Sequence, residues 1–251
     1  MQVDVQGGAR PTPFLQARDI FATEFSIERP IKVFVRDDPD QRTWTAHYPD
    51  YHVMNISRTE ATSGMARELT LHEFAHMVRH EEGHSSHHSS VTEGVYLAAG
   101  GRHVDPDRVA HCIQIANHMK DIYADDLTVE VAQTTKLVDF FESSLAASLA
   151  NRPGTGVYGN GTRVSSRADS AIAAVNAAFA VALTERNGLA DDDHRLFELA
   201  MMLAADAPRV PFSRFRQLFR TLEEDPDESS HRRTLVDAFG TYLGTEKNAA
   251  D

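Results

Sequence analysis

Two histidines stand four residues apart in the run Leu71-His72-Glu73-Phe74-Ala75-His76. On an α-helix, residues with this spacing project from one face about 40° apart around the axis, so both imidazoles can reach one metal ion. Glu73 is rotated from His72 by about 100°, which leaves its carboxylate off the metal but within reach of a water molecule beside it. The pattern therefore predicts that His72 and His76 bind a metal and that Glu73 is a general base.

The surroundings of this motif resemble those of the zincin metallopeptidases. A sheet-like segment, residues 43–56, comes directly before the helical pattern of residues 62–80, which no proline interrupts. The resemblance covers roughly residues 43–130. It implies an α+β fold, Zn²⁺ as the cofactor, and hydrolysis of a peptide or protein substrate by activated water with a glutamate base.

A catalytic zinc needs a third protein ligand, and three residues are candidates. His80 continues the row of histidines, but eight helical residues separate it from His72 by about 12 Å, so it is rejected and expected to be a cation near the helix C-terminus. Glu93, followed by Gly94, resembles the Glu-Gly segment that supplies the third ligand in some gluzincins. Glu93 also fits a capping box with Ser90, which is a structural role.

Asp121 is the preferred third ligand. Residues 117–125 resemble the second zinc helix of zincins, whose pattern is Glu-x-x-Ala-Asp. The resemblance implies that Asp121 binds the metal and that Asp125 orients a ligand histidine, with Asp121 standing where the family pattern has Glu. Glu93 remains the alternative. A polar stripe at three- and four-residue spacing supports the choice: Gln114, Asn117, Asp121 and Asp125.

Two further questions about this region concern the oxyanion and the histidines after Gly83. Hydrolysis also needs a side chain that stabilises the oxyanion of the substrate, and four residues are candidates for this role. Residues 84–88 are predicted to be a solvated loop, although their histidines could form a second, weaker metal site. The oxyanion candidates are Tyr96, His111, His118 and Tyr123, and the histidines of the predicted loop are His84, His87 and His88.

Hydrophobic periodicity and turn residues predict a few strands followed mostly by helices. Strands are expected at residues 31–36, 43–48, 51–56 and 127–131, the second and third forming a β-hairpin or a pair of sheet strands. Helices are expected at residues 14–25, 62–80, 90–99, 105–126, 137–149, 168–186, 192–205, 212–224 and 229–243. Together they predict a zincin-like domain over residues 1–150, a Gly/Ser-rich loop or linker over 151–166, and a helical extension over 167–251.

The net charge of −12 argues against a nucleic-acid partner, because phosphate backbones require a basic face. Only four of the basic residues are lysines, a bias typical of salt-loving proteins, and the whole chain resembles a haloarchaeal protein family that carries this motif. No apolar run has the roughly 18 residues of a membrane span, and the first residues do not resemble an export signal, so we expect a cytoplasmic protein without membrane contact. The single cysteine, Cys112, excludes an internal disulfide.

The rival hypothesis comes from another class of function: a catalytically inactive, metal-stabilised binding or regulatory module. The two hypotheses differ in the coordination sphere, because an enzyme keeps one metal position open whereas a structural site is closed by four ligands. The sequence does not indicate an oligomeric state or a particular substrate.

Overall fold

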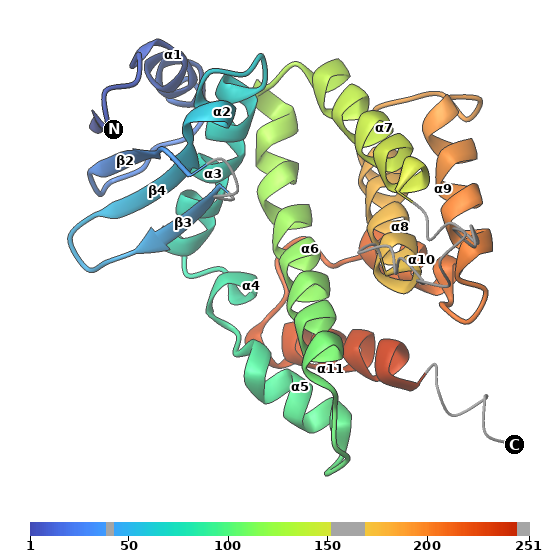
Figure 1. Ribbon diagram of the computed structural model, residues 1–251. Helices are drawn as coiled ribbons and strands as arrows, with labels where there is room; N and C mark the ends of the chain where they lie inside the picture. The colour runs from blue at the N-terminus through green and yellow to red at the C-terminus, as the bar shows by residue number, and fades with distance from the viewer. Residues whose placement is uncertain (39–42, 152–168, 245–251) are drawn as a thin grey trace, which may run out of the picture. The chain divides into compact units, whose positions relative to one another are not determined.

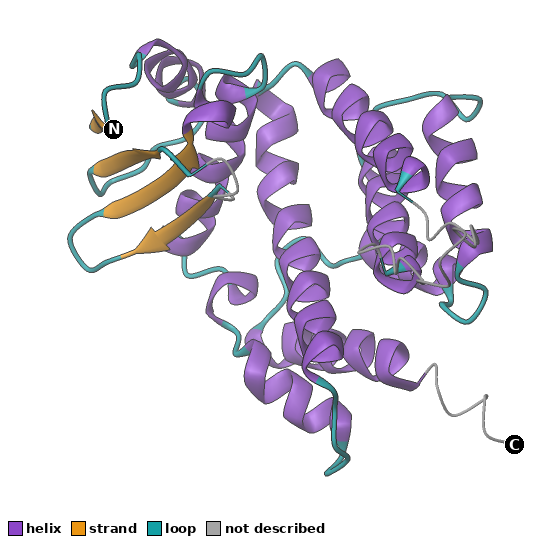
Figure 2. Cartoon of the chain, viewed as in Figure 1, coloured by secondary structure: helices purple, strands orange, loops and turns teal. Residues whose placement is uncertain are grey.

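The computed structural model describes residues 1–38, 43–151 and 169–244. The strands belong to the N-terminal part of the chain and the remainder is helical (Figure 2), which confirms the predicted α+β class. The strands are β1 (Val3–Gln6), β2 (Ile31–Arg36), β3 (Trp44–His47) and β4 (His52–Ser57). The helices are α1 (Thr12–Phe21), α2 (Arg58–Ala61), α3 (Ala66–Glu81), α4 (Ser85–His88), α5 (Val91–Ala99), α6 (Pro106–Val131), α7 (Thr134–Ala150), α8 (Ser170–Arg186), α9 (Arg195–Asp206), α10 (Phe212–Arg220) and α11 (Glu228–Leu243).

The four strands form one sheet in the order β1-β2-β4-β3. β2 pairs in parallel with both β1 and β4, whereas β3 pairs antiparallel with β4, from Trp44 opposite Asn55 to His47 opposite His52. The predicted strand over residues 31–36 and the predicted hairpin are confirmed. Strand β1 was not predicted, because a run of four residues with two polar members gives a weak pattern and its pairing with β2 is a tertiary contact.

Contacts divide the chain into two compact units. The first comprises residues 1–89 and 120–136, and the second comprises residues 90–119 and 137–251. The long helix α6 is shared, so its last part, from Lys120 to Val131, belongs to the first unit. The predicted boundary at residues 151–166 stays a prediction, since all but its first residue lies outside the described residues.

Helix α3 packs one face on the core of the first unit. Leu71, Phe74, Ala75 and Val78 have the i, i+3, i+4, i+7 spacing of a buried stripe, and all are at most 5 % exposed. This stripe lies in the same cluster as apolar residues of the strands and of α1, and in Figure 1 the helix runs beside the sheet. Residues 72 and 76 therefore fall on the neighbouring face of α3, outside the core. The strand and α1 residues of the cluster include Phe14, Phe21, Ile31, Val33, Met54 and Ile56.

The last part of α6 packs against α3. Ala124 and Leu127 join the same core cluster, and the Arg79 side chain donates a hydrogen bond to the Tyr123 carbonyl oxygen at 3.0 Å. The predicted strand at residues 127–131 is wrong, because the helix continues to Val131. Burial of Leu127 in the core cluster outweighs the strand preference of the β-branched residues that follow it.

The described residues of the second unit form helices and the loops that connect them. Helix α8 is buried on nearly all sides and packs against α9 and α10, while α5 packs against α11. The predicted capping of α5 is confirmed in part, since the Ser90 hydroxyl accepts a hydrogen bond from the Glu93 backbone N–H. No helix of the described residues combines the length and apolarity that crossing a membrane requires.

Replacing Gly7 by alanine is expected to destabilise the first unit. Gly7 has φ +95°, and a Cβ atom there would lie 2.4 Å from the Val35 carbonyl oxygen of β2. Gly8 also has positive φ, +71°, but its Cβ would meet no atom within 4 Å. We expect Gly7→Ala to lower the free energy of unfolding by about 2–4 kcal/mol and Gly8→Ala by about 1–2 kcal/mol, measured by urea denaturation. Equal losses in the two variants would contradict the packing role of Gly7.

Candidate metal centre

Three side chains of the first unit bring their ligand atoms together. Nε2 of His72 and Nε2 of His76 lie 3.1 Å apart. Oδ1 of Asp121 lies 3.7 Å from the first of these nitrogens and 3.3 Å from the second. Within the described residues, these three form the group of His, Cys, Asp or Glu side chains that could hold a metal ion. The predicted ligands therefore meet, although they lie up to 49 residues apart in sequence.

Asp125 contacts the other nitrogen of His72. Oδ1 of Asp125 lies 2.7 Å from Nδ1 of His72, and the Asp125 side chain is buried. Burial acts to lower the pKa of His72, but the charges of Asp125 and Asp121 and the hydrogen bond to Asp125 outweigh burial and raise this pKa to about 10. The contact is the one that the sequence analysis assigned to Asp125, with Nε2 of the imidazole left to face the ligand group.

Glu73 is buried beside the two histidines. Its side chain is 6 % exposed, and burial raises the pKa of Glu73 above its usual value, while His76 and His72 act in the opposite direction. Thr45 of β3 forms a side-chain hydrogen bond with this carboxylate. The sequence analysis did not identify Thr45, because a threonine on a strand far from the motif gives no signal until the sheet places it.

Glu93 has a different environment from Asp121. It lies on α5 of the second unit, 49 % exposed, where its carboxylate forms an ion pair with Arg232 at 3.2 Å. Packing explains why the neighbouring residue, Gly94, is a glycine, since a Cβ atom there would lie 3.0 Å from the Phe239 ring. Both residues of the Glu-Gly pair therefore have structural roles within the second unit.

His80 is not a cation at the helix end, so that expectation is wrong. Its ring stacks on His47 at a centroid distance of 3.9 Å and on His88 at 4.8 Å. Burial, followed by the neighbouring His88 and His52, lowers the pKa of His80 to about 4. Burial, together with the proximity of other imidazoles, makes the charged form of His80 unfavourable and outweighs attraction to the helix C-terminus.

The prediction of a solvated loop at residues 84–88 is also wrong. Residues 85–88 form helix α4, and His84 and Ser86 are buried. Nε2 of His87 lies 2.8 Å from Nδ1 of His76, and burial is the largest of the effects that lower the pKa of His87 far below its usual value. The sequence analysis named His87 only as a possible ligand of a second, weaker metal site and missed its contact with His76. The available signal was the group of His84, His87 and His88 shortly after the motif.

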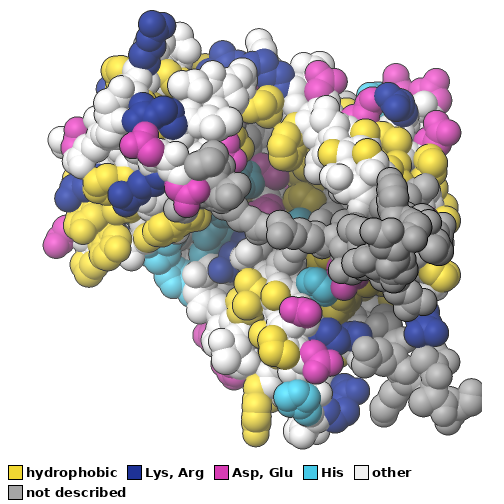
Figure 3. Space-filling model, in the orientation of Figure 1, with side chains coloured by type: hydrophobic (Ala, Val, Ile, Leu, Met, Phe, Trp, Pro, Cys, Tyr) yellow, Lys and Arg dark blue, Asp and Glu magenta, His cyan; other side chains and the backbone are white. Residues whose placement is uncertain are grey.

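The histidines around α3 extend beyond the candidate ligands. Nδ1 of His47 lies 2.9 Å from Nδ1 of His52, whose Nε2 lies 2.9 Å from the Glu81 carboxylate. Burial, then the nearby His80 and His52, lowers the pKa of His47 to about 3. Figure 3 shows histidine side chains gathered on the surface beside β3 and the C-terminal end of α3.

The four oxyanion candidates have other contacts. Tyr123 is buried, with its ring 4.5 Å from that of His84. In the second unit, His118 Nε2 lies 2.8 Å from Asn176 Oδ1, and His111 Nδ1 lies 2.6 Å from the Tyr242 hydroxyl. Tyr96 is 73 % exposed on α5. None of these contacts ranks one candidate above the others.

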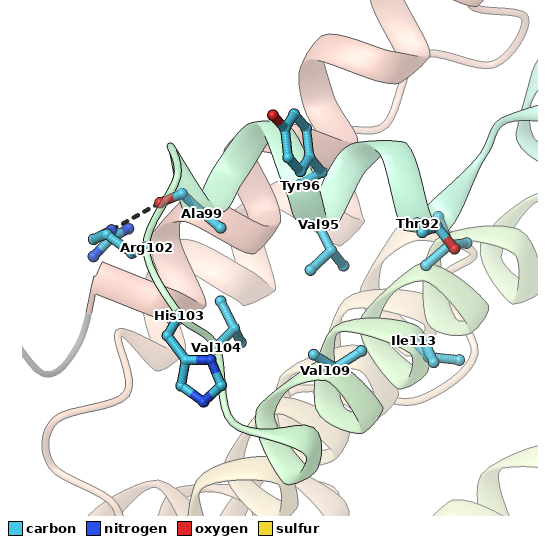
Figure 4. A pocket seen from close by; sticks show the side chains of 10 residues that line it. Thr92, Val95, Tyr96, Ala99, Arg102, His103, Val104, Val109 and Ile113 are labelled. Atoms are coloured by element: carbon cyan, nitrogen blue, oxygen red, sulfur yellow. Dashed lines mark hydrogen bonds between the residues drawn. The ribbon is translucent and has the colours of Figure 1, made fainter.

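The second unit contains an apolar groove of about 550 Å³ between α5 and the first part of α6 (Figure 4). Its lining holds no carboxylate and no thiol, and its arginine, Arg102, donates a hydrogen bond to the Ala99 carbonyl oxygen at 2.9 Å. The groove therefore lacks the carboxylates that a site of the His72–Glu73–Asp121 kind uses. Its lining residues are Val91, Thr92, Val95, Tyr96, Ala99, Arg102, His103, Val104, Val109 and Ile113.

A family model matches residues 1–244, so the chain belongs to that family, described as a family of unknown function (DUF5781). Comparisons with curated proteins and with solved structures find no match.

The half-buried His80 is expected to make the metal-free protein sensitive to acid. In the unfolded chain a histidine takes up a proton near pH 6.5, whereas folded His80 does so only near pH 4. The unfolded state therefore binds more protons between these values, so stability is lost as the pH falls from about 6.5 to 4. His80→Gln removes this difference. The free energy of unfolding should then fall less steeply with pH, with up to one proton fewer taken up on unfolding.

The measurement is urea denaturation in EDTA at several pH values between 7 and 4. His103→Gln, at a position whose side chain is 87 % exposed, is the matched control and should follow the wild type. A His80→Gln variant with the same pH dependence as wild type would contradict the role of His80 burial.

Proposed function

We propose that this protein is a zinc-dependent metallohydrolase, a peptidase of the zincin type, and that its first unit is a zincin-like domain. The observation that carries the proposal is the convergence of His72 Nε2, His76 Nε2 and Asp121 Oδ1, with Glu73 buried beside them. The order of elements supports it, since the hairpin of β3 and β4 is followed, after the short helix α2, by α3, and a later helix supplies the acids.

The donor set fits a zinc ion. Two imidazole nitrogens and one carboxylate oxygen are the ligands typical of catalytic zinc sites. Ligand atoms about 2.0–2.1 Å from a tetrahedral zinc lie about 3.3 Å from one another. The three distances here are 3.1, 3.3 and 3.7 Å, so small side-chain adjustments would suffice.

The shorter side chain of Asp121 requires α6 to approach α3 closely. Ala75 of α3 and Ala124 of α6 are both fully buried in the same core cluster. Small side chains at a helix contact allow the two axes to come together, because no long side chain separates them. The core therefore supports an aspartate at the position where the zincin pattern has a glutamate.

Zinc held by His72, His76 and Asp121 would supply Lewis-acid chemistry, by making water nucleophilic near neutral pH and by polarising a substrate carbonyl. Glu73 takes the proton of the attacking water and delivers it to the leaving nitrogen, as a general base and then a general acid. Its burial favours a proton on the carboxylate, and its hydrogen bond to Thr45 holds the side chain in place. Asp125 keeps the His72 ring oriented through Nδ1.

Partial exposure of the ligands favours an enzyme over a purely structural site. The side chains of His72 and Asp121 are 24 % and 26 % exposed, so solvent reaches the ligand group. The described residues offer three ligands there, which leaves a position for water or substrate. A metal that only stabilised the fold would be enclosed by four ligands.

A peptide substrate is supported by β3. Strand β3 is at the edge of the sheet that the described residues form, and its Thr45 contacts the proposed base. An edge strand presents backbone N–H and C=O groups that an extended peptide can pair with. A peptide bound in this way would lie beside Glu73.

Glu73→Gln is expected to abolish peptide hydrolysis while zinc stays bound. Glutamine keeps the shape of the side chain but cannot accept the proton, so kcat should fall by about 10²–10⁴-fold. The measurements are turnover of a quenched fluorescent peptide library and zinc content by mass spectrometry. Glu82→Gln, a surface substitution after the last turn of α3, is the control and should keep wild-type turnover. Retained turnover in Glu73→Gln would refute the base assignment.

Asp121→Ala is expected to weaken zinc binding at least tenfold, because one of three ligands is lost. Glu93→Ala removes the alternative ligand and should leave the affinity unchanged. Both dissociation constants can be measured by competition with a chromophoric chelator. The opposite result, a loss only in Glu93→Ala, would move the third ligand to α5.

A further inference from the structure

The two candidate ligand histidines both have a side-chain partner at Nδ1. For His72 the partner is Asp125, as the sequence indicated. For His76 it is His87, whose Nε2 lies 2.8 Å from Nδ1 of His76. His87 is on α4, outside the motif and outside the helix that supplies the acids.

The hydrogen bonds behind His87 have one consistent direction. If Nε2 of His76 binds the metal, its Nδ1 carries the proton and donates to Nε2 of His87. The neutral His87 ring then carries its own proton on Nδ1, which lies 2.8 Å from Ser86 Oγ. The Ser86 hydroxyl is left to donate to Nδ1 of His84, also 2.8 Å away. Each hydrogen bond in this series therefore joins one donor to one acceptor.

The chain of hydrogen bonds is anchored in the interior. Ser86 is fully buried and His84 is 6 % exposed, with its ring against that of Tyr123. Nδ1 of His84 also accepts a hydrogen bond from the Ser86 backbone N–H, which caps α4. Because both residues behind His87 are held in place, the His87 ring has little freedom to turn away from His76.

We propose that His87, supported by Ser86 and His84, is a positioning residue that fixes the tautomer and orientation of His76 required for metal binding. The proposal rests on the metal site of the proposed function, and it assigns His87 the same task for His76 that Asp125 has for His72. A hydrogen-bond partner of this kind typically changes metal affinity by about 10–100-fold.

The test compares two substitutions of His87 in the full-length protein. His87→Phe keeps a ring of similar size but has no acceptor for the His76 proton. His87→Gln keeps an acceptor oxygen and is the conservative variant that should rescue binding. His88→Phe is the matched control, because His88 lies on the same short helix, is exposed, and pairs with the backbone oxygen of His80 rather than with a candidate ligand.

The readout is the zinc dissociation constant, measured by chelator competition after EDTA treatment. We expect it to rise about 10–100-fold in His87→Phe, and to stay within about threefold of wild type in His87→Gln and in His88→Phe. Thermal unfolding of the metal-free variants shows whether the fold is kept. Equal zinc affinity in His87→Phe and wild type would overturn the proposal, as would a loss in His87→Gln as large as in His87→Phe.

A second measurement needs no substitution and remains informative if His87→Phe fails to fold. In zinc-loaded wild type labelled with ¹⁵N-histidine, a scalar coupling between Nδ1 of His76 and Nε2 of His87 is expected across the hydrogen bond. A His76 Nδ1–H that exchanges freely with water and shows no such coupling would overturn the assignment.

The outcome separates this proposal from the proposed function. Zinc affinity that depends on His87, in a protein that cleaves no peptide, would support the positioning role and refute the peptidase. If the protein cleaves peptides and its zinc affinity does not depend on His87, the peptidase would be supported and the positioning role refuted. Absence of zinc binding by the wild type would overturn both.

Discussion

The packing of α3 against the last part of α6 is the constraint on which the candidate site depends. It places two imidazoles against two carboxylates at the margin of a core, where charge interacts strongly. The pKa values of two neighbouring residues of α3 are both raised, but for different reasons. The carboxylates raise the pKa of His72 to about 10 against the effect of burial, which favours the charged imidazole, whereas burial raises the pKa of Glu73 and favours the neutral carboxyl group. A metal cation at the ligand group would take the place of the imidazole proton, so metal and proton compete for one position.

Helix α3 serves two purposes through its periodicity. The stripe of Leu71, Phe74, Ala75 and Val78 secures the helix on the sheet, and the face one residue further round presents His72 and His76. Because the ligands are neighbours of core residues on the same turns, their backbone positions are as well determined as the core itself. This is the arrangement in which a site gains precision from a rigid element.

The surroundings of the histidines are arranged by short elements around that helix. Strand β3 brings Thr45 to Glu73, and α4 brings His87 to His76. Burial keeps several imidazoles near the site, including His47 and His80, neutral around pH 7, because their pKa values are lowered to about 3 and 4. Neutral imidazoles avoid the mutual repulsion that a cluster of charged histidines would have beside a cation.

The sequence alone determined the parts of the protein that depend on local periodicity. The pattern of residues along the chain predicted the strand over residues 31–36 and the hairpin. It also placed His72 and His76 on one helical face, and Asp121 and Asp125 on one face of another helix. The family match adds no activity to these inferences, so the hydrolytic function stays a proposal.

Only the tertiary structure decided which distant side chains meet. It placed Asp121 against the histidines, gave Glu93 an ion pair with Arg232, and folded residues 85–88 into a helix that carries His87. It also continued α6 through residues 127–131, where local preference favoured a strand. For Asp121, Glu93 and residues 127–131, the deciding energy is the burial or pairing of a side chain with a partner far away in the sequence, which no local pattern records.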